Sequence, residues 1–162
     1  MRNVIASSLV IALCAASAAA EQARSGSATG KPAIKACSFL PKDLVMKVSG
    51  AANKLVFDLP PEEEPVGQSG AACEYADIRL QIDAFTPAFV DDTAKKDKAW
   101  MPVSGVGDRA WFRDNKGHYA ELIGHAGGRT FTIQMGIPFE STAEKVKPNV
   151  ITLANAIVPK LK

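Results

Sequence analysis

The sequence has too little excess charge to predict a nucleic-acid partner. Its 162 residues carry a formal net charge of only +2, from 19 Lys and Arg against 17 Asp and Glu. A nucleic-acid-binding domain concentrates Lys and Arg on one surface. The lysines near Lys96 are surrounded by aspartates such as Asp92, a mixture typical of a solvated helix face. We therefore expect no nucleic-acid partner.

The sequence also lacks an apolar run long enough to cross a membrane. The run from Val4 to Ala15 is shorter than the ~20 residues that a bilayer span requires. It follows Arg2 and precedes small residues at Ala18 and Ala20, which is the plan of a secretory signal peptide. We expect residues 1–20 to be a cleaved signal peptide and the mature protein to be periplasmic or secreted, with no transmembrane segment.

Cysteine is scarce, and the sequence contains three. Cys14 lies in the predicted signal peptide, and Leu13 before it is not the small residue that a lipidated cysteine follows, so a lipoprotein is the weaker alternative. Cys37 and Cys73 remain in the mature chain. Two cysteines in an oxidising compartment most simply form one bridge, and these two lack the Cys-x-x-Cys spacing of a redox pair. We predict a structural Cys37–Cys73 disulfide.

Composition divides the mature chain into a leader and one domain. Residues 21–35 are rich in Ser, Gly, Ala and charge and show no apolar periodicity, which is typical of a disordered leader. Residues 36–162 have the size of one ordinary domain. We expect this segment to form a single domain.

Periodicity and turn residues predict an α+β domain. Helices are predicted over 41–49, over 87–97 after a Thr86 cap, and over 141–161, with a Ser141–Glu144 capping box and a break or kink at Pro148. Strands are predicted over 54–59, 73–85, 109–112, 118–125 and 129–136, and the proline-rich segment 60–65 is predicted to be an exposed loop. This order favours an antiparallel sheet of about five strands with three helices packed on it.

One motif resembles a dinucleotide-binding fingerprint. Residues 105–110 read Gly-Val-Gly-Asp-Arg-Ala and match the Gly-x-Gly-x-x-Ala pattern. That pattern binds phosphate only where it opens a helix, whereas here it opens an aromatic strand at Trp111. We interpret the glycines as turn residues and expect no cofactor.

The sequence has few residues for metal binding or catalysis. His118, Glu121 and His125 are the nearest approach to a metal site, but on a strand His118 faces away from the other two. Neither a Gly-x-Ser-x-Gly nor a Ser-x-x-Lys nucleophile motif occurs. Paired carboxylates cannot be recognised from spacing, and candidates such as Asp83 and Glu121 lie on predicted solvated strand faces. We predict no metal and no catalytic residue, while a small periplasmic hydrolase with unidentified acid and base residues stays an alternative.

Aromatic residues gather around the glycine turn, and binding surfaces favour Trp and Tyr. Ordinary packing beneath the turn is the alternative explanation. The residues of the candidate binding surface are Trp100, Gly105, Gly107, Asp108, Trp111 and Tyr119.

Three segments in order resemble a group of small bacterial exported proteins and lipoproteins of unknown function. The segments are residues 36–40 (Ala-Cys-Ser-Phe-Leu) with the helix after them, 73–75 (Cys-Glu-Tyr), and 103–111 (Val-Ser-Gly-Val-Gly-Asp-Arg-Ala-Trp). The pattern of the group is Cys-Ser-Leu-Leu, Cys-x-Tyr and Gly-x-Gly-Asp-x-Ala, from which this chain departs at Phe39 and Pro41. The resemblance implies a Cys37–Cys73 bridge and a helix-flanked antiparallel sheet similar to PsbP-like domains, and it carries over no catalytic residue.

Together these features lead us to expect an exported, non-catalytic binding or accessory module of the bacterial cell envelope. Its partner would be a protein or a small ligand that contacts the candidate binding surface. A structural envelope component is a further alternative, beside the small hydrolase.

Overall fold

The computed structural model of the chain describes residues 34–49 and 58–162. The predicted signal peptide, nearly all of the predicted leader and most of the strand predicted over 54–59 lie outside these residues. Residues Pro32–Lys162 group into one compact unit, to which all the elements below belong.

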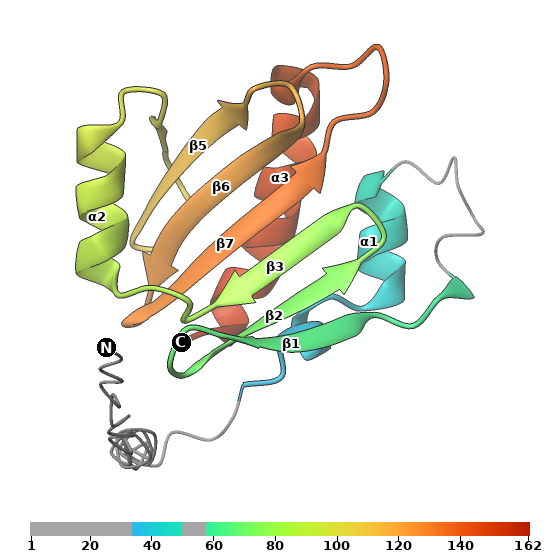
Figure 1. Cartoon of the computed structure of the whole chain (residues 1–162), viewed down its shortest axis with the longest axis horizontal. Helices are drawn as coiled ribbons and strands as arrows, with labels where there is room; N and C mark the ends of the chain where they lie inside the picture. Colours follow the sequence, from blue (N-terminus) through green and yellow to red (C-terminus); the bar gives the residue numbers. More distant parts are fainter. Residues whose placement is uncertain (1–33, 50–57) are drawn as a thin grey trace, which may run out of the picture. The chain divides into compact units, whose positions relative to one another are not determined.

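In its described residues the chain forms an α+β fold built on an antiparallel sheet of seven strands (Figure 1). The spatial order is β1-β2-β3-β7-β6-β5-β4, so the first hairpin and the later meander meet where β3 pairs with β7. The strands are β1 (Glu62–Val66), β2 (Gly70–Tyr75), β3 (Ile78–Ile82), β4 (Met101–Val103), β5 (Arg109–Asn115), β6 (Tyr119–Ala126) and β7 (Arg129–Gly136). The predicted class is therefore confirmed.

The prediction of about five strands is wrong, because seven form in the described residues. The segment predicted as one strand over 73–85 is a hairpin, and Ala76 turns the chain with a φ of 58°. Most of the proline-rich segment 60–65, predicted to be an exposed loop, belongs to β1 instead. Pro65 is tolerated there because β1 is an edge strand that pairs with β2 alone. At the other edge β4 has three residues, too few to show an alternation pattern.

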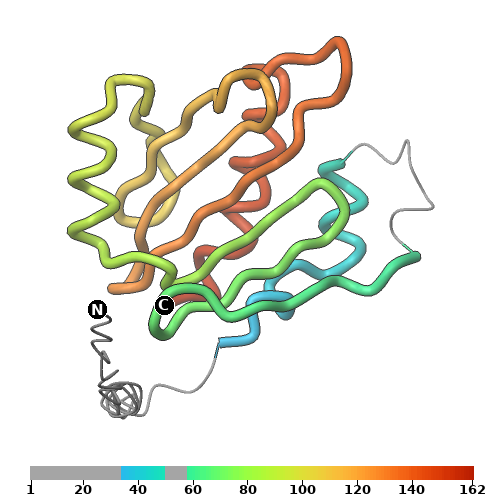
Figure 2. Tube along the Cα trace, in the orientation of Figure 1, coloured from blue at the N-terminus to red at the C-terminus, as the bar shows by residue number. Residues whose placement is uncertain are grey.

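Three helices of the described residues pack on the sheet, and they cover both of its faces. One face is covered by α1 (Lys42–Ser49) and α3 (Ala143–Ile157), together with the 3-10 turns η1 (Ala36–Phe39) and η3 (Val158–Lys160). In Figures 1 and 2, α3 crosses behind the strands. The second helix, α2 (Pro87–Lys96), packs through Val90 and Ala94 against Ile123 on the opposite face.

The main core lies between the sheet and α1 and α3. Alternate residues of each central strand point into it, as Phe131, Ile133 and Met135 of β7 do. From α3, Val146, Val150, Leu153 and Ile157 complete the layer. Each such side chain stabilises the fold by about 1.5–3 kcal/mol when fully buried. The residues between them on the same strands point to the other face of the sheet.

Two of the helix starts test the predicted caps. Thr86 caps α2 as predicted, accepting a hydrogen bond from the Phe89 amide at 3.2 Å. The predicted Ser141 cap is off by one residue, because Thr142 accepts from Lys145 and α3 begins at Ala143. The helix does not break at Pro148. Burial of the apolar stripe of α3 offsets the cost of about 3 kcal/mol for a proline inside a helix.

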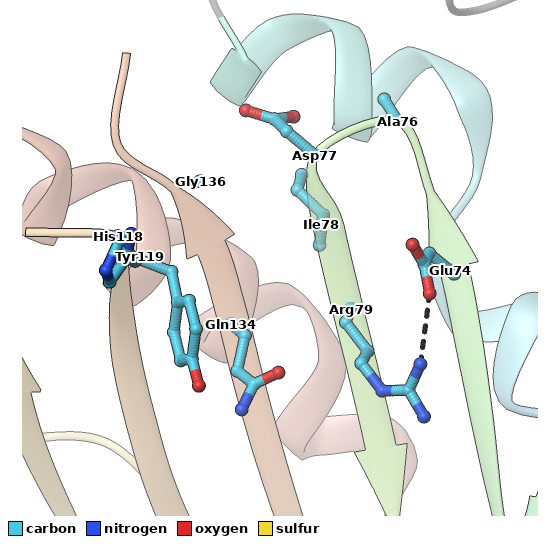
Figure 3. A pocket seen from close by; sticks show the side chains of 9 residues that line it. All are labelled: Glu74, Ala76, Asp77, Ile78, Arg79, His118, Tyr119, Gln134 and Gly136. Atoms are coloured by element: carbon cyan, nitrogen blue, oxygen red, sulfur yellow. Dashed lines mark hydrogen bonds and ion pairs between the residues drawn. The ribbon is translucent and has the colours of Figure 1, made fainter. Parts of the chain in front are cut away.

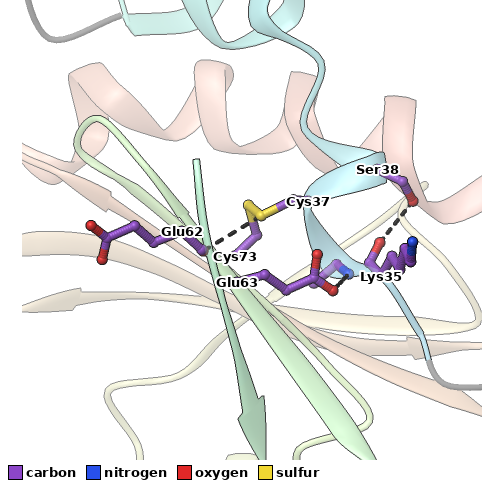
Figure 4. Close-up of a disulfide and its surroundings, with 7 residues drawn as sticks. Lys35, Cys37, Ser38, Glu62, Glu63 and Cys73 are labelled. Atoms are coloured by element: carbon purple, nitrogen blue, oxygen red, sulfur yellow. Dashed lines mark hydrogen bonds between the residues drawn. A yellow bond between two sulfur atoms is a disulfide. The ribbon is translucent and has the colours of Figure 1, made fainter. Parts of the chain in front are cut away.

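The predicted Cys37–Cys73 disulfide joins η1 to β2 (Figure 4). Beside it the Ala36 amide donates to Glu63 Oε1 at 2.9 Å, so the first turn is fixed to the sheet edge by two links. A structural disulfide indicates an oxidising, extracytoplasmic environment. None of the helices formed by residues 34–49 and 58–162 has the length and apolarity needed to cross a membrane.

Removing the disulfide tests its contribution to stability. The cysteines are 36 residues apart, and opening a loop of that length costs about 3–4 kcal/mol in the chain-entropy model. We expect Cys37→Ala/Cys73→Ala to lower the free energy of unfolding by about that amount, measured by urea denaturation. Reduced wild-type protein is the control and should match the variant. Equal midpoints for oxidised wild type and variant, or alkylation of both thiols without reduction, would contradict the bridge.

Candidate functional site

The face of the sheet opposite the main core, here called the free face, is covered only in part, by α2. Strand register places one polar residue from each of six neighbouring strands in a single row across it. In spatial order this polar row consists of Glu62, Glu74, Arg79, Gln134, Glu121 and Arg113. Each member of the row is a direct cross-strand neighbour of the next, so their side chains can pair.

Glu121 is the most buried charge in this row, with 5% of the residue exposed. Its Oε2 accepts from Arg113 Nε at 2.7 Å and lies 2.6 Å from Arg113 Nη2. Its Oε1 accepts from Gln134 Nε2 at 2.8 Å. A carboxylate removed from water needs such partners, and here both of its oxygens are occupied. Glu121 is therefore held in place by its neighbours on either side.

Arg113 extends this network from the sheet to α2. Its Nη1 lies 3.4 Å from the Oδ2 of Asp97, the C-cap residue of α2. Its guanidinium stacks 4.3 Å above the ring of Trp100, a cation–π contact. Trp100 is buried, and its indole Nε1 has no hydrogen-bond partner within the described residues. Arg113 thus links the end of α2 to the buried carboxylate.

A second ionic network binds α2 at Asp91. The Oδ1 of Asp91 lies 3.1 Å from His125 Nε2, and its Oδ2 accepts from Arg109 Nη1 at 3.1 Å. On the other side of the imidazole, Nδ1 is 3.9 Å from Asp108 Oδ2. The helix is therefore attached to the sheet at two points along its length.

Between α2 and the free face lies a cavity of about 310 Å³, here called the α2 groove. Gln81, Thr132 and Ile123, direct neighbours on three adjacent strands, line it from the sheet. Phe85 and Phe89 line the helix side and stack with ring centroids 4.9 Å apart, while 45% and 52% of them stay exposed. The remaining lining residues are Val90, Thr93, Trp100, Arg113, Glu121 and Gln134.

A smaller hollow of about 210 Å³ lies further along the free face and shares Gln134 with the groove (Figure 3). Figure 3 shows the Tyr119 ring and the Gln134 amide on one side and Arg79 on the other. Arg79 points toward Glu74, which also lines the hollow, with Nη1 3.0 Å from Oε2, and it also pairs with Glu64. Two of the charged residues that line this hollow, Arg79 and Glu74, are thus paired with each other.

Asp77 is the carboxyl group of this region whose acidity is perturbed. Desolvation raises its pKa above the usual 3.8, and hydrogen bonds from its own backbone and from Ser49 oppose that rise. In Figure 3 its carboxylate lies at the end of the hollow away from the Tyr119 hydroxyl and the Gln134 amide. Asp77 lines this smaller hollow and not the α2 groove.

The structure separates the residues of the predicted binding surface. Trp100 and Trp111 pack in one apolar cluster beneath α2. Tyr119 lies at the smaller hollow. The glycine turn lies elsewhere and serves packing, because a Cβ at Gly107 would approach the His125 carbonyl oxygen to 2.6 Å. Gly105, also part of the predicted surface, lies in the same turn with a φ of +80°, and a Cβ there would meet no neighbouring atom within 4 Å.

Asp108, the last residue of that predicted surface, joins two turns. It accepts from the Gly127 amide at 2.9 Å, while its own amide donates to the His125 carbonyl at 2.9 Å. The turn before β5 is thereby bound to the turn between β6 and β7. Of the predicted residues, Trp100 alone lines the α2 groove.

Sequence reasoning missed most of the groove. Glu121 was predicted to lie on a solvated strand face, whereas α2 and Arg113 bury it. Alternation does place Glu121 and Gln134 on one face. Their strand register and the helix packed above them are set by the tertiary structure and cannot be read from either segment alone. Within the described ranges, no three His, Cys, Asp or Glu side chains come together as a metal site.

Comparison with family models, curated proteins and solved structures finds no match for this chain. The functional argument therefore rests on the geometry of the free face.

A double-mutant cycle tests the buried ion pair. Arg113→Ala leaves the buried Glu121 carboxylate without its cation and should lower the free energy of unfolding by about 3 kcal/mol. Glu121→Gln should cost less, because Arg113 is 27% exposed and keeps Asp97. The double variant should lose less unfolding free energy than the two single variants lose together, by at least about 1 kcal/mol. Arg79→Ala is the control, since its exposed partners limit the loss to about 1 kcal/mol. Equal losses for Arg79→Ala and Arg113→Ala would refute this role.

The pKa of Asp77 predicts a pH-dependent gain on its replacement. Because its folded-state pKa is raised above 3.8, ionising this carboxyl costs stability at neutral pH and nothing once it is protonated in both states. We expect Asp77→Asn to unfold at higher denaturant concentration than wild type at pH 7. The difference should shrink as the pH falls toward 3.8. Asp92→Asn, on the exposed side of α2, is the control. A difference independent of pH would contradict the prediction.

Proposed function

We propose that the chain is an exported, non-catalytic binding or accessory module of the bacterial cell envelope, and that the α2 groove is its ligand site. The observation that carries this proposal is the mixture of surfaces in the groove. Exposed aromatic rings and uncharged polar side chains lie beside a fixed ion pair. A concave apolar surface with a few convergent polar groups is typical of ligand sites.

The state of the acidic and basic side chains supports binding over hydrolysis. A general base needs a carboxylate or imidazole that is free to accept a proton from the substrate. Glu121 has both oxygens engaged, by Arg113 and Gln134. His125 is held between Asp91 and Asp108, away from the groove lining. These groups fix the shape of the site, and the hydrolase alternative has no assembled acid–base pair in it.

Export of the chain to the periplasm or beyond is supported by two independent features. One is the signal-peptide pattern at residues 1–20, and the other is the Cys37–Cys73 disulfide. The ligand would then be an extracytoplasmic molecule, either a protein segment or a small compound.

Phe85 and Phe89 are the side chains on which we expect binding to depend most. Both lie at the groove with about half of their surface exposed. Full burial of such a side chain is worth about 1.5–3 kcal/mol, and covering the exposed half of each ring under a ligand contributes about half of that. Central aromatic anchors of this kind carry most of the affinity in many interfaces.

Native mass spectrometry of protein isolated from its own cells, without refolding, tests the proposal. We expect a reproducible added mass on the wild-type protein that Phe89→Ala loses. Phe139→Ala removes the same ring from a site outside the groove, at a residue 95% exposed, and should keep the added mass. Loss in both variants, or a bare mass for the wild type, would contradict the groove as the ligand site.

A further inference from the structure

The sheet lines the α2 groove with one uncharged row and, at its border, with the paired side chains of Glu121 and Arg113. Gln81, Thr132 and Ile123 form this middle row. The polar row with Glu121 and Arg113 runs along one side of it. On the other side, one step further along the strands, are Asp83 and His125.

The charged residues of the flanking rows that lie nearest the groove are paired within the protein. Glu121 pairs with Arg113, and across the sheet Arg79 pairs with Glu74. On the other side, Asp83 pairs with Arg129 at 2.8 Å, and His125 with Asp91. A charged ligand in the groove would have to break one of these pairs or be desolvated without a counter-charge. Either event costs several kcal/mol, so the groove disfavours charged ligands.

Uncharged hydrogen-bonding groups stay available to a ligand. The Gln81 amide and the Thr93 hydroxyl line the groove and form no hydrogen bond within the described residues. The Gln134 amide donates to Glu121, which leaves its carbonyl oxygen as an acceptor. Together these groups supply both donors and acceptors, all of them neutral.

The aromatic side of the groove adds a flat apolar surface. The rings of Phe85 and Phe89 are 17° from parallel and about half exposed. A pyranose ring combines an apolar C–H face, which packs on aromatic rings, with hydroxyls around its rim that bind amides and other hydroxyls. An extended peptide fits less well, because the face of a sheet offers no free backbone groups. The edge strands also carry prolines, at Pro65 and Pro102.

We infer that the ligand of the α2 groove is a neutral saccharide. One ring packs on Phe85 and Phe89, and its hydroxyls bind Gln81 and Thr93. The smaller hollow shares Gln134 with the groove and places Tyr119 beside it, which gives room for a second sugar ring. This inference rests on the proposed function and specifies the chemical class of its ligand.

A matched pair of trisaccharides tests the inference on the oxidised mature protein. Tri-N-acetylchitotriose is neutral, and its deacetylated form has the same backbone with positive charges. Maltotriose and trigalacturonate form a second, neutral and anionic, pair. In two-dimensional ¹H–¹⁵N spectra we expect a neutral trisaccharide to shift the Trp100 indole and the Gln81 and Gln134 side-chain amide signals. Its charged counterpart should bind at least about tenfold more weakly, since 1.4 kcal/mol is a factor of ten.

An isosteric variant locates the contact. Gln81→Glu keeps the shape of the side chain but adds a charge and removes a donor, and should weaken neutral-saccharide binding about tenfold. Gln68→Glu makes the same change in the turn between β1 and β2, outside the groove, and should bind as wild type does. Thermal melting of both variants establishes that the fold is intact. If Gln81→Glu unfolds, Thr93→Val takes its place as the test.

The outcomes separate this inference from the proposed function. Equal or tighter binding of the charged trisaccharides would overturn the inference of a neutral saccharide ligand. So would the absence of any ¹H–¹⁵N signal shift with a neutral trisaccharide at millimolar concentration. In either case a Phe89-dependent added mass in native mass spectrometry would leave the groove as the ligand site. If native mass spectrometry also shows no added mass that depends on Phe89, both the saccharide inference and the groove as the ligand site would be overturned.

Discussion

The free face of the sheet depends on one buried carboxylate, that of Glu121. Period-2 alternation requires half of the residues of β6 to point away from the main core, and Glu121 is one of them. Once α2 covers this position, an unpaired charge would cost several kcal/mol. Arg113 and Gln134, the direct neighbours of Glu121 on β5 and β7, remove that cost by binding one oxygen each. The buried charge is thus compensated only in the register that places Arg113 and Gln134 opposite Glu121 on the three strands.

The same ion pair determines where α2 lies and therefore where the groove forms. Arg113 reaches the C-cap of α2 through Asp97, and the His125 network holds the helix at Asp91. Phe89 and Val90, just before the Asp91 attachment, and Thr93, between the two attachments, line the space above Gln81 and Thr132 without filling it. The groove is the remaining space, and its charged borders are already neutralised. For this reason its chemistry favours an uncharged, polar ligand with an apolar face.

Much of the fold could be predicted from local signals, and little of the site could. Alternation in β3 and β7, the Thr86 cap and the two mature cysteines were sufficient for the α+β class and the disulfide. The hairpin at Ala76 was missed because no glycine, proline or asparagine marks it. Strand β1 was missed because Pro65 is tolerated only in an edge strand. The groove was missed because burial of Glu121 depends on which helix packs over it, a property that no single segment carries.

Hydrogen–deuterium exchange of Arg113→Gln, compared with wild type and with Arg79→Gln, tests most directly whether this ion pair holds α2 over the free face. Local opening of a helix raises the exchange of its amides without affecting elements that stay packed. We predict that the amides of α2 exchange at least about tenfold faster in Arg113→Gln, while those of α3 are unchanged and Arg79→Gln resembles wild type. Exchange of α2 at the wild-type rate in Arg113→Gln would contradict the account, because the groove would then form without its anchoring charge pair.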